Sequence, residues 1–165
     1  MVSFEFKHGK PLKVHRSIVE RNPKLLLLDA SRKEDDSWAP LSTSKKDTPS
    51  LKHISRSAGH VLIHYLYTNN YQTLTWDGPT EGKGKTILKL KTAVEVYVTA
   101  LEYDMGDLGE LAREQLTLLS KDIDGFTIIE IVRDAYPFTK ANDTWFLTFI
   151  KEIIKTAFET PKATA

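Results

Sequence analysis

Alternating apolar and polar residues open the chain, which then changes to the spacing typical of helices. Residues 2–6 carry an apolar side chain at every second position, between polar or charged neighbours, and this is the pattern of a half-buried strand. Residues 12–14 repeat the alternation after a turn at 8–10, so the sequence predicts a β-hairpin. A further short strand is expected near residues 50–53.

Most of the remaining apolar residues recur every three or four positions, as on the buried face of a helix. Two short helices are expected first, over residues 15–20 and from Asn22-Pro23 to about residue 30. Residues 71–76 are expected to be extended, and residues 78–85 form a predicted Gly/Lys-rich loop. The longer predicted helices cover, approximately, residues 55–68, 90–105, 107–119, 126–136 and 142–157.

Polar residues and glycine mark the expected ends of these helices. Ser55 or Ser57 can accept hydrogen bonds from the first turn of the helix that follows. Gly106 is predicted to take the left-handed conformation that ends a helix, and Asp107 to cap the next one. Asn142 is the predicted cap of the last helix, whose apolar face has the most regular spacing in the chain.

Strands early in the chain and helices late indicate an α+β domain with about two to four short strands and six or seven helices. The polar residues 31–50 are expected to form a long solvated loop, in which Trp38 is the large apolar residue. A loop of that length inside a compact domain is usually either functional or mobile. Trp38 is therefore a candidate contact residue.

Composition changes this picture mainly by exclusion. The chain has 165 residues, a formal net charge of +1 and no cysteine. The near-neutral charge gives no indication of a nucleic acid or an anionic membrane as partner, and the missing thiols exclude disulfides, thiolate catalysis and Cys-bound zinc. The first residues lack the apolar segment of a signal peptide, and the longest aliphatic run, residues 25–28, is too short to span a bilayer. A cytoplasmic or nuclear protein is therefore expected.

Two motifs suggest chemistry, but each lacks an essential part. Residues 81–86 end like a phosphate-binding P-loop, yet Pro79 stands where the motif requires glycine. His60 and His64 share one helix face at the spacing of a two-histidine metal site, and His53 is the nearest candidate third ligand. A solvated helix edge is the simpler interpretation of these histidines. A metal-dependent protein that uses them is a remote alternative.

The clustered charges also have structural explanations. Asp104 and Asp107 lie at expected helix ends, where capping and the helix dipole account for carboxylates. The lysines within residues 83–91 have no aromatic side chain between them, so they indicate a solvated face rather than a nucleic-acid groove. No Ser-His-Asp arrangement has a supporting local signature, and no cofactor is expected. By elimination, the sequence favours binding over catalysis.

Three blocks of sequence resemble the BTB/POZ domain family, especially the short BTB-only proteins of fungi. Residues 14–19 read Val-His-Arg-Ser-Ile-Val and precede a capped helix start. Residues 61–71 match the end of the family's hallmark helix and read Val-Leu-Ile-His-Tyr-Leu-Tyr-Thr-Asn-Asn-Tyr, with Asn69 in place of the usual glycine. Residues 96–112 hold the third block, Val-Tyr-Val-Thr-Ala-Leu-Glu-Tyr followed by Leu-Gly-Glu-Leu-Ala.

This resemblance implies a BTB/POZ-like helical cluster capped by a small β-sheet over residues 1–120, a C-terminal helical extension over 121–160 and a flexible tail over 161–165. The implied function is that of a non-enzymatic protein–protein interaction module, either an adaptor or an oligomerisation domain. A cullin-type ubiquitin ligase is one candidate assembly. The implied partner is a protein, either another BTB chain or a cullin.

Tyr67 matches the contact tyrosine of the family and, with Trp38, Asn69 and Asn70, makes up the predicted protein-binding set. Many BTB domains dimerise by exchanging an N-terminal segment that does not precede the hairpin here, so a monomer becomes credible beside a dimer. The loop before the hallmark helix also lacks the apolar-x-Glu element of cullin-recruiting members. The main alternative is a homo-oligomeric scaffold without ligase association, which would use apolar residues such as Trp38 or Trp145.

Overall fold

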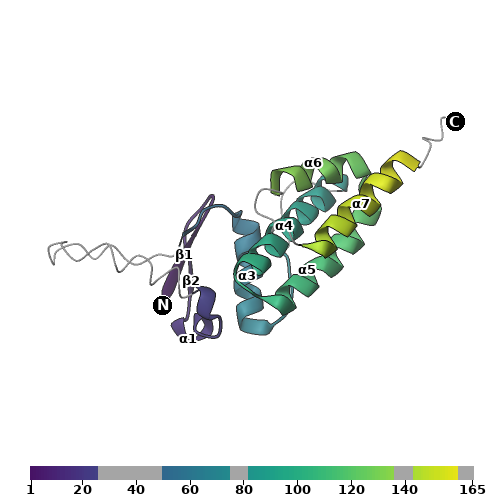
Figure 1. The fold of residues 1–165 in the computed structure, drawn as a ribbon. Helices are drawn as coiled ribbons and strands as arrows, with labels where there is room; N and C mark the ends of the chain where they lie inside the picture. Colours follow the sequence, from purple (N-terminus) through teal and green to yellow (C-terminus); the bar gives the residue numbers. More distant parts are fainter. Residues whose placement is uncertain (26–49, 75–81, 136–142, 160–165) are drawn as a thin grey trace, which may run out of the picture.

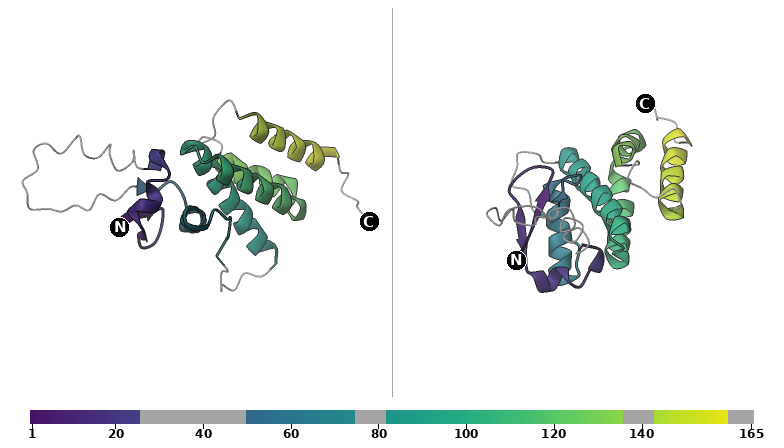
Figure 2. Two further views of the ribbon diagram at one scale, coloured as in Figure 1. Left: turned by 90° about the horizontal axis from the view of Figure 1, so that it is seen from below. Right: turned by 60° about the vertical axis from the view of Figure 1, so that its left-hand side comes forward.

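The computed structural model describes residues 1–25, 50–74, 82–135 and 143–159, and it confirms the predicted α+β class. A small three-stranded sheet lies at one end of the molecule, and a cluster of helices makes up the rest (Figure 1). The chain moves away from the sheet as it proceeds, so the last described helix lies at the end opposite to the first strand (Figures 1 and 2).

Strand β1 (Val2–Phe6) is the centre of the sheet, and it pairs antiparallel with β2 (Leu12–Val14) and parallel with β3 (Ser50–Leu51). The register places Val2 opposite Val14. The three apolar side chains of β1 are buried and alternate with partly exposed neighbours, as a period-two pattern requires. The predicted hairpin and the short strand beyond it are both confirmed.

Helices α1 (Arg16–Val19) and α3 (Arg56–Thr68) lie next to the sheet. Ser55 is the N-cap of α3, and its hydroxyl oxygen accepts a hydrogen bond from the backbone N–H of Ala58 at 3.3 Å. Asn69 ends the helix in the left-handed conformation, with a φ of 56°. The predicted start and end of this helix are therefore confirmed.

Helix α4 (Lys83–Glu102) is longer than predicted. The expectation of a loop is wrong for residues 83–85, which form the first turn of the helix, while residues 78–81 lie outside the described part of the chain. Gly82, with a φ of 76°, makes the turn into the helix. The helix tolerates Gly84 in its first turn, because a cost of about 1 kcal/mol is small against the packing of 20 residues. Residues 71–74 form no strand.

Helix α5 (Gly106–Leu119) follows α4 after a tight turn. Asp104 takes the left-handed conformation (φ 59°), and the N–H of the next residue donates back to the Ala100 carbonyl at 2.8 Å, as in a Schellman turn. The predictions for Gly106 and Asp107 are therefore wrong: the glycine begins α5, and the aspartate lies in its first turn without capping it. An aspartate can replace glycine at the left-handed position because its short side chain tolerates that conformation.

The last described elements are the 3₁₀ turn η1 (Ser120–Asp122) and helices α6 (Gly125–Ala135) and α7 (Thr144–Glu159). Helices α6 and α7 pack against each other (Figure 2). Asp143 accepts a hydrogen bond from the first turn of α7 and so takes the role predicted for Asn142, which lies outside the described residues.

One continuous core joins the sheet to all the long helices. Helix α4 lies at its centre and contacts α3, α5 and α6. None of the helices in the described part of the chain combines the length and the apolar character needed to cross a membrane. The largest fully buried side chains are Tyr97, Phe4, Phe146, Leu25, Leu51, Leu90, Leu108, Leu116 and Ile128.

Candidate protein-interaction surface

The predicted residues Tyr67, Asn69 and Asn70 lie together on the surface at the C-terminal end of α3. The Tyr67 hydroxyl accepts a hydrogen bond from the backbone N–H of His15 at 3.0 Å, and it lies 2.6 Å from Nδ1 of the same residue. These contacts fasten the end of α3 to the start of α1, so Tyr67 has a structural role within the fold. A role in partner binding stays a prediction. Trp38, the fourth predicted residue, lies outside the described part of the chain.

The histidines do not come together as a metal site. His60 and His64 line a cleft of about 480 Å³ on α3, and burial together with the nearby charge of Arg56 lowers the pKa of His60. His53 lies elsewhere, with its Nε2 3.1 Å from the carboxylate of Glu102. Among the described residues, no group of three or more metal-ligating side chains is close enough to hold an ion.

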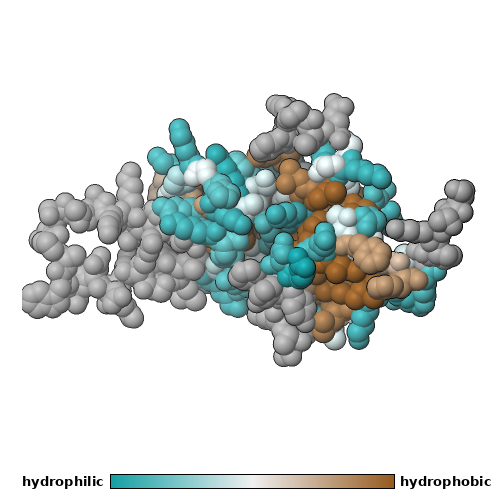
Figure 3. All heavy atoms as spheres, turned by 90° about the horizontal axis from the view of Figure 1, so that it is seen from above, coloured by the Kyte–Doolittle hydropathy of each residue, from teal (hydrophilic) through white to brown (hydrophobic). Residues whose placement is uncertain are grey.

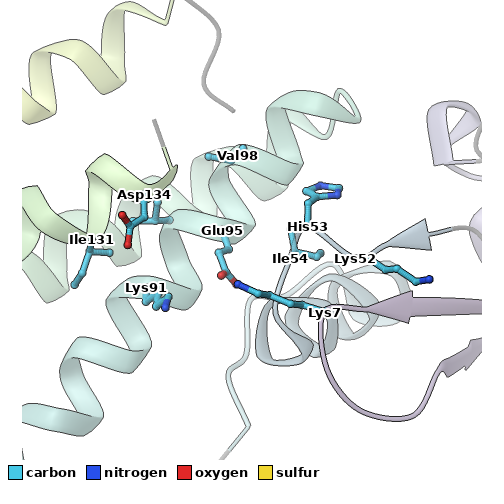
Figure 4. Close-up of a pocket in the computed structure, with 10 residues that line it drawn as sticks. Lys7, Lys52, His53, Ile54, Lys91, Glu95, Val98, Ile131 and Asp134 are labelled. Carbon is cyan, nitrogen blue, oxygen red and sulfur yellow. The ribbon is translucent and has the colours of Figure 1, made fainter. Parts of the chain in front are cut away.

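A cleft of about 510 Å³ lies where the sheet meets α4 and α6 (Figure 4). Lys7 points toward Glu95 across this cleft, and His53 and Lys52 lie on the sheet side. The Glu95 carboxylate accepts hydrogen bonds from both the backbone N–H (3.0 Å) and the hydroxyl of Ser55, so it serves the start of α3. The cleft therefore holds charges of both signs over an apolar floor, and Glu95, one of its two acidic side chains with Asp134, is already engaged in the fold.

The strongest surface feature is the apolar face of the α6–α7 helix pair. Phe126 is 52% exposed and Phe158 is 71% exposed, and their ring centroids are 5.7 Å apart in an edge-to-face contact. Ile154 is 39% exposed, and Ile129 and Ile150 are partly exposed between them. Helices α6 and α7 form a helical hairpin, which is distinct from the β-hairpin of β1 and β2, and we call these five residues the hairpin surface. Hydrophobic side chains gather over this end of the molecule in Figure 3.

Two grooves border the hairpin surface. The first, of about 250 Å³, lies between the two helices, and the second, of about 720 Å³, lies where α6 begins and α7 ends. The first is lined by Ile128, Ile129, Val132, Arg133, Phe149, Ile150 and Ile153. The second is lined by Ser120, Lys121, Ile123, Asp124, Gly125, Phe126, Ile128, Ile153, Thr156 and Ala157. The largest contiguous apolar patch on a protein surface is often functional, and the hairpin surface is therefore the candidate site of association.

A partly buried polar contact holds the start of α7 against α4. The Tyr97 hydroxyl donates a hydrogen bond to the Asp143 carboxylate, whose other oxygen accepts from the backbone N–H of Phe146 at 3.1 Å. Burial, followed by this hydrogen bond, raises the pKa of Tyr97. The guanidinium of Arg113 lies over the Trp145 ring, 5.1 Å from its centroid. Trp145 is thus engaged inside the fold and only partly exposed, which leaves it a small role in any scaffold surface.

The start of α6 is also fixed by a capping residue. Asp124 accepts hydrogen bonds from the backbone N–H groups of Phe126 and Thr127, both at 3.1 Å, and from the Thr127 hydroxyl. These bonds, the hydroxyl first, lower the pKa of Asp124 below its ordinary value. Phe126 therefore projects from a capped helix start, and its exposure follows from the position of that helix end.

The expectation that one apolar stripe of α7 faces inward is only partly right. Phe146 is buried, but Ile154 is exposed, and Phe158 projects from the same side of the helix. A signal for this was present in the sequence: apolar residues cover more of the circumference of α7 than a single stripe needs. Such a helix has an apolar side left over after it has packed on its own chain.

Comparisons with known proteins identify the family to which the chain belongs. A family model described as the HAC6 N-terminal domain matches residues 27–123. Two curated relatives are subtelomeric hrmA-associated cluster proteins from two strains of Aspergillus fumigatus, each 28% identical over 108 residues. That segment is 66% of this chain and 27% of the relatives, so the chain spans about a quarter of their length. No solved structure matches.

The resemblance to BTB/POZ domains is therefore wrong, because the family that matches is a different one. The cause is physical. Val61, Leu66, Tyr97 and Leu108, which belong to the resembling blocks, are buried core residues, and any helical cluster of this order needs apolar side chains at such spacings. The ubiquitin-ligase adaptor role rested on that resemblance and loses its support. The expectation of a fungal family fits the relatives.

Proposed function

We propose that this chain, which belongs to the HAC6 N-terminal domain family, is a non-enzymatic protein-interaction module that docks a protein partner through the hairpin surface. The observation that carries the proposal is the exposure of Phe126 and Phe158 on a packed helix pair. Aromatic side chains in such positions are the usual anchors of protein interfaces.

The chemistry of the surface favours a helix as its ligand. The two grooves run along and across a pair of helices, and an amphipathic helix can lay its apolar face into such a groove with anchors at every third or fourth residue. The charged residues of α6 and α7 are of both signs, so the surface carries no field that would select a polyanion. The charged residues are Glu130, Arg133, Asp134, Lys151, Glu152, Lys155 and Glu159.

The position of the surface in the chain suggests that the framework and the contact surface are formed by different segments. The family match ends at residue 123, and both helices of the hairpin follow it. We infer that the matched segment supplies the framework and that the hairpin supplies the contact specific to this chain. The activity of the much longer relatives is a separate matter, because only 27% of their length is matched.

Site-specific photo-crosslinking tests the proposal. Phe158 is replaced by p-benzoylphenylalanine, and the purified chain is irradiated alone and in an extract of a filamentous fungus. The matched control carries the same group at Leu118, which is 57% exposed on α5 and lines neither groove. We expect discrete protein adducts from position 158, reduced by Phe126→Ser, and none of these adducts from position 118. Equal labelling from both positions, or none from position 158, would refute the proposal.

A further inference from the structure

We propose that the protein docked at the hairpin surface is a second copy of this chain, bound about a two-fold axis parallel to α6 and α7. The inference rests on the proposed function and adds the identity of the partner. In this arrangement α6 of one copy packs on α7 of the other, and the four helices form a bundle with antiparallel neighbours. The inference follows from the shape of the surface, from the equal height of two opposite charges along the helix axes, and from the exposed apolar area.

The shape of the surface is self-complementary. The start of α6 lies against the end of α7, because a side-chain carbon built on Gly125 would be 2.6 Å from the Ala157 methyl group. Phe158 projects from this level, next to the 720 Å³ groove to which Gly125 and Phe126 contribute. A two-fold axis parallel to the helices keeps every residue at its own level. Phe158 of each copy then meets the groove of the other, and the surface supplies both the projection and the hollow.

Two opposite charges lie at one level on the rims of the surface. Helices α6 and α7 are antiparallel, so five residues forward from Gly125 and six residues back from Ala157 give nearly equal rises. Those steps end at Glu130 and Lys151, which are both exposed. Glu130 is four residues after Phe126, so it lies on the same helix face as that ring.

Lys151 likewise lies three residues before Ile154, on the exposed side of α7. No ion pair between described residues uses Glu130 or Lys151. The proposed axis places Glu130 opposite Lys151 of the partner subunit, and symmetry makes this pair twice. An axis perpendicular to the helices would place α6 on α6 and would form neither pair, so the charges select the parallel axis.

The area fits a reversible dimer. Phenylalanine side chains present roughly 200 Å² each, so the exposed fractions of 52% and 71% leave roughly 250 Å² on Phe126 and Phe158. With the three isoleucines, the surface reaches roughly 400–500 Å² on each copy. Two such faces bury roughly 800–1,000 Å², which is below the usual size of a stable interface. Interfaces of this size belong to weak and transient encounters, so we expect a reversible dimer in the micromolar range or weaker.

Analytical ultracentrifugation of the full chain, from about 1 to about 300 μM, tests the inference in the range expected for so small an interface. We expect the wild-type chain and Leu118→Ser to dimerise alike. The double variant Phe126→Ser/Phe158→Ser is expected to remain a monomer. Glu130→Lys or Lys151→Glu should each weaken the dimer about tenfold, because each creates two like-charge pairs. The double variant Glu130→Lys/Lys151→Glu should return to within about threefold of the wild type.

A chain that stays monomeric at every concentration would overturn the inference, and so would a dimer that ignores the phenylalanine variants. The inference would also be overturned if each single charge reversal weakened the dimer and the double reversal did not restore it, since the parallel axis would then be wrong. The charge variants change exposed side chains and keep the test valid if a phenylalanine variant folds poorly. If the chain is monomeric while position 158 still crosslinks other proteins, the proposed function stands and only the second copy is refuted.

Discussion

Gly125 offers the sharpest test of how α6 and α7 pack, because the sign of the effect is decided by the structure. It is the first residue of α6, where alanine is ordinarily the better residue. Replacing a helical glycine by alanine stabilises a protein by about 0.4–1 kcal/mol when there is room. At this position there is none: a Cβ would lie 2.6 Å from the Cβ of Ala157 and 3.4 Å from the Ile153 carbonyl oxygen.

The expected result of Gly125→Ala is therefore a loss. Forcing a methyl group into a packed contact costs about 1–3 kcal/mol, because the backbone of α7 has to move away. For a chain of this size, that corresponds to a fall in melting temperature of roughly 2–10 °C. Gly106→Ala is the matched control, since Gly106 is also the first residue of a helix but has no atom within 4 Å of its added Cβ. It should raise the melting temperature slightly.

Urea unfolding followed by far-ultraviolet circular dichroism measures both variants, and a second-site change completes the test. Ala157→Gly alone should cost about 1 kcal/mol, as for a glycine in a helix interior. Combined with Gly125→Ala, it removes the opposing methyl group. The double variant should therefore lose less unfolding free energy than the sum of the two single losses. If Gly125→Ala stabilises the protein as Gly106→Ala does, or if the losses simply add, the close contact of the two helices is wrong.

Three further predictions address other contacts. Gly59→Ala should destabilise the protein by about 1–3 kcal/mol in the same urea assay, because the new Cβ would lie 2.5 Å from the Phe6 ring; no loss would mean that α3 is not packed so closely on the sheet. Tyr97→Phe should cost about 1.5–3 kcal/mol by removing the hydrogen bond to the Asp143 carboxylate, with faster amide exchange at the start of α7; unchanged exchange there would contradict it. Asp124→Asn should lose about 0.3–1 kcal/mol at neutral pH. The pKa of Asp124 is lowered in the folded protein, so its contribution is complete above the unfolded pKa near 4 and disappears as the pH falls through the lower folded value. The difference between wild type and variant should therefore shrink below about pH 4, and a difference that stays constant to pH 2 would refute the assignment.

Much of the fold could be predicted because local signals and burial agree. The alternation of β1 and the capping residue Ser55 each specify a strand or a helix end with a few neighbouring atoms. The turn after α4 shows where such reasoning fails. A glycine at position 106 is the ordinary sequence signal for a left-handed residue, but Asp104 takes that conformation. The choice depends on how α5 packs on α4, which is a long-range contact.

The candidate surface was less predictable, because exposure is a property of the assembled chain. The spacing of α7 correctly predicts a helix, yet it does not say which apolar residues find a place in the core. Phe146 and Phe158 have the same side chain on the same helix, and only the first is buried. The difference arises at the N-terminal end of α7, where Asp143 and Trp145 fasten the helix to α4 and α5. The far end extends beyond those helices and contacts α6.

The fastening of α7 also connects the family framework to the proposed docking surface. Tyr97 and Arg113 lie within the segment that the family model matches, whereas Asp143, Trp145 and the whole hairpin follow it. The orientation of α7 is thus set by residues of the framework, while its exposed side chains belong to the helix itself. Substitutions of exposed residues on α6 and α7 leave these buried contacts unaltered, so the proposed docking surface can change without loss of the core. The same separation explains why blocks of core residues misled the assignment of the family: they specify packing, and helical clusters of different families share that packing.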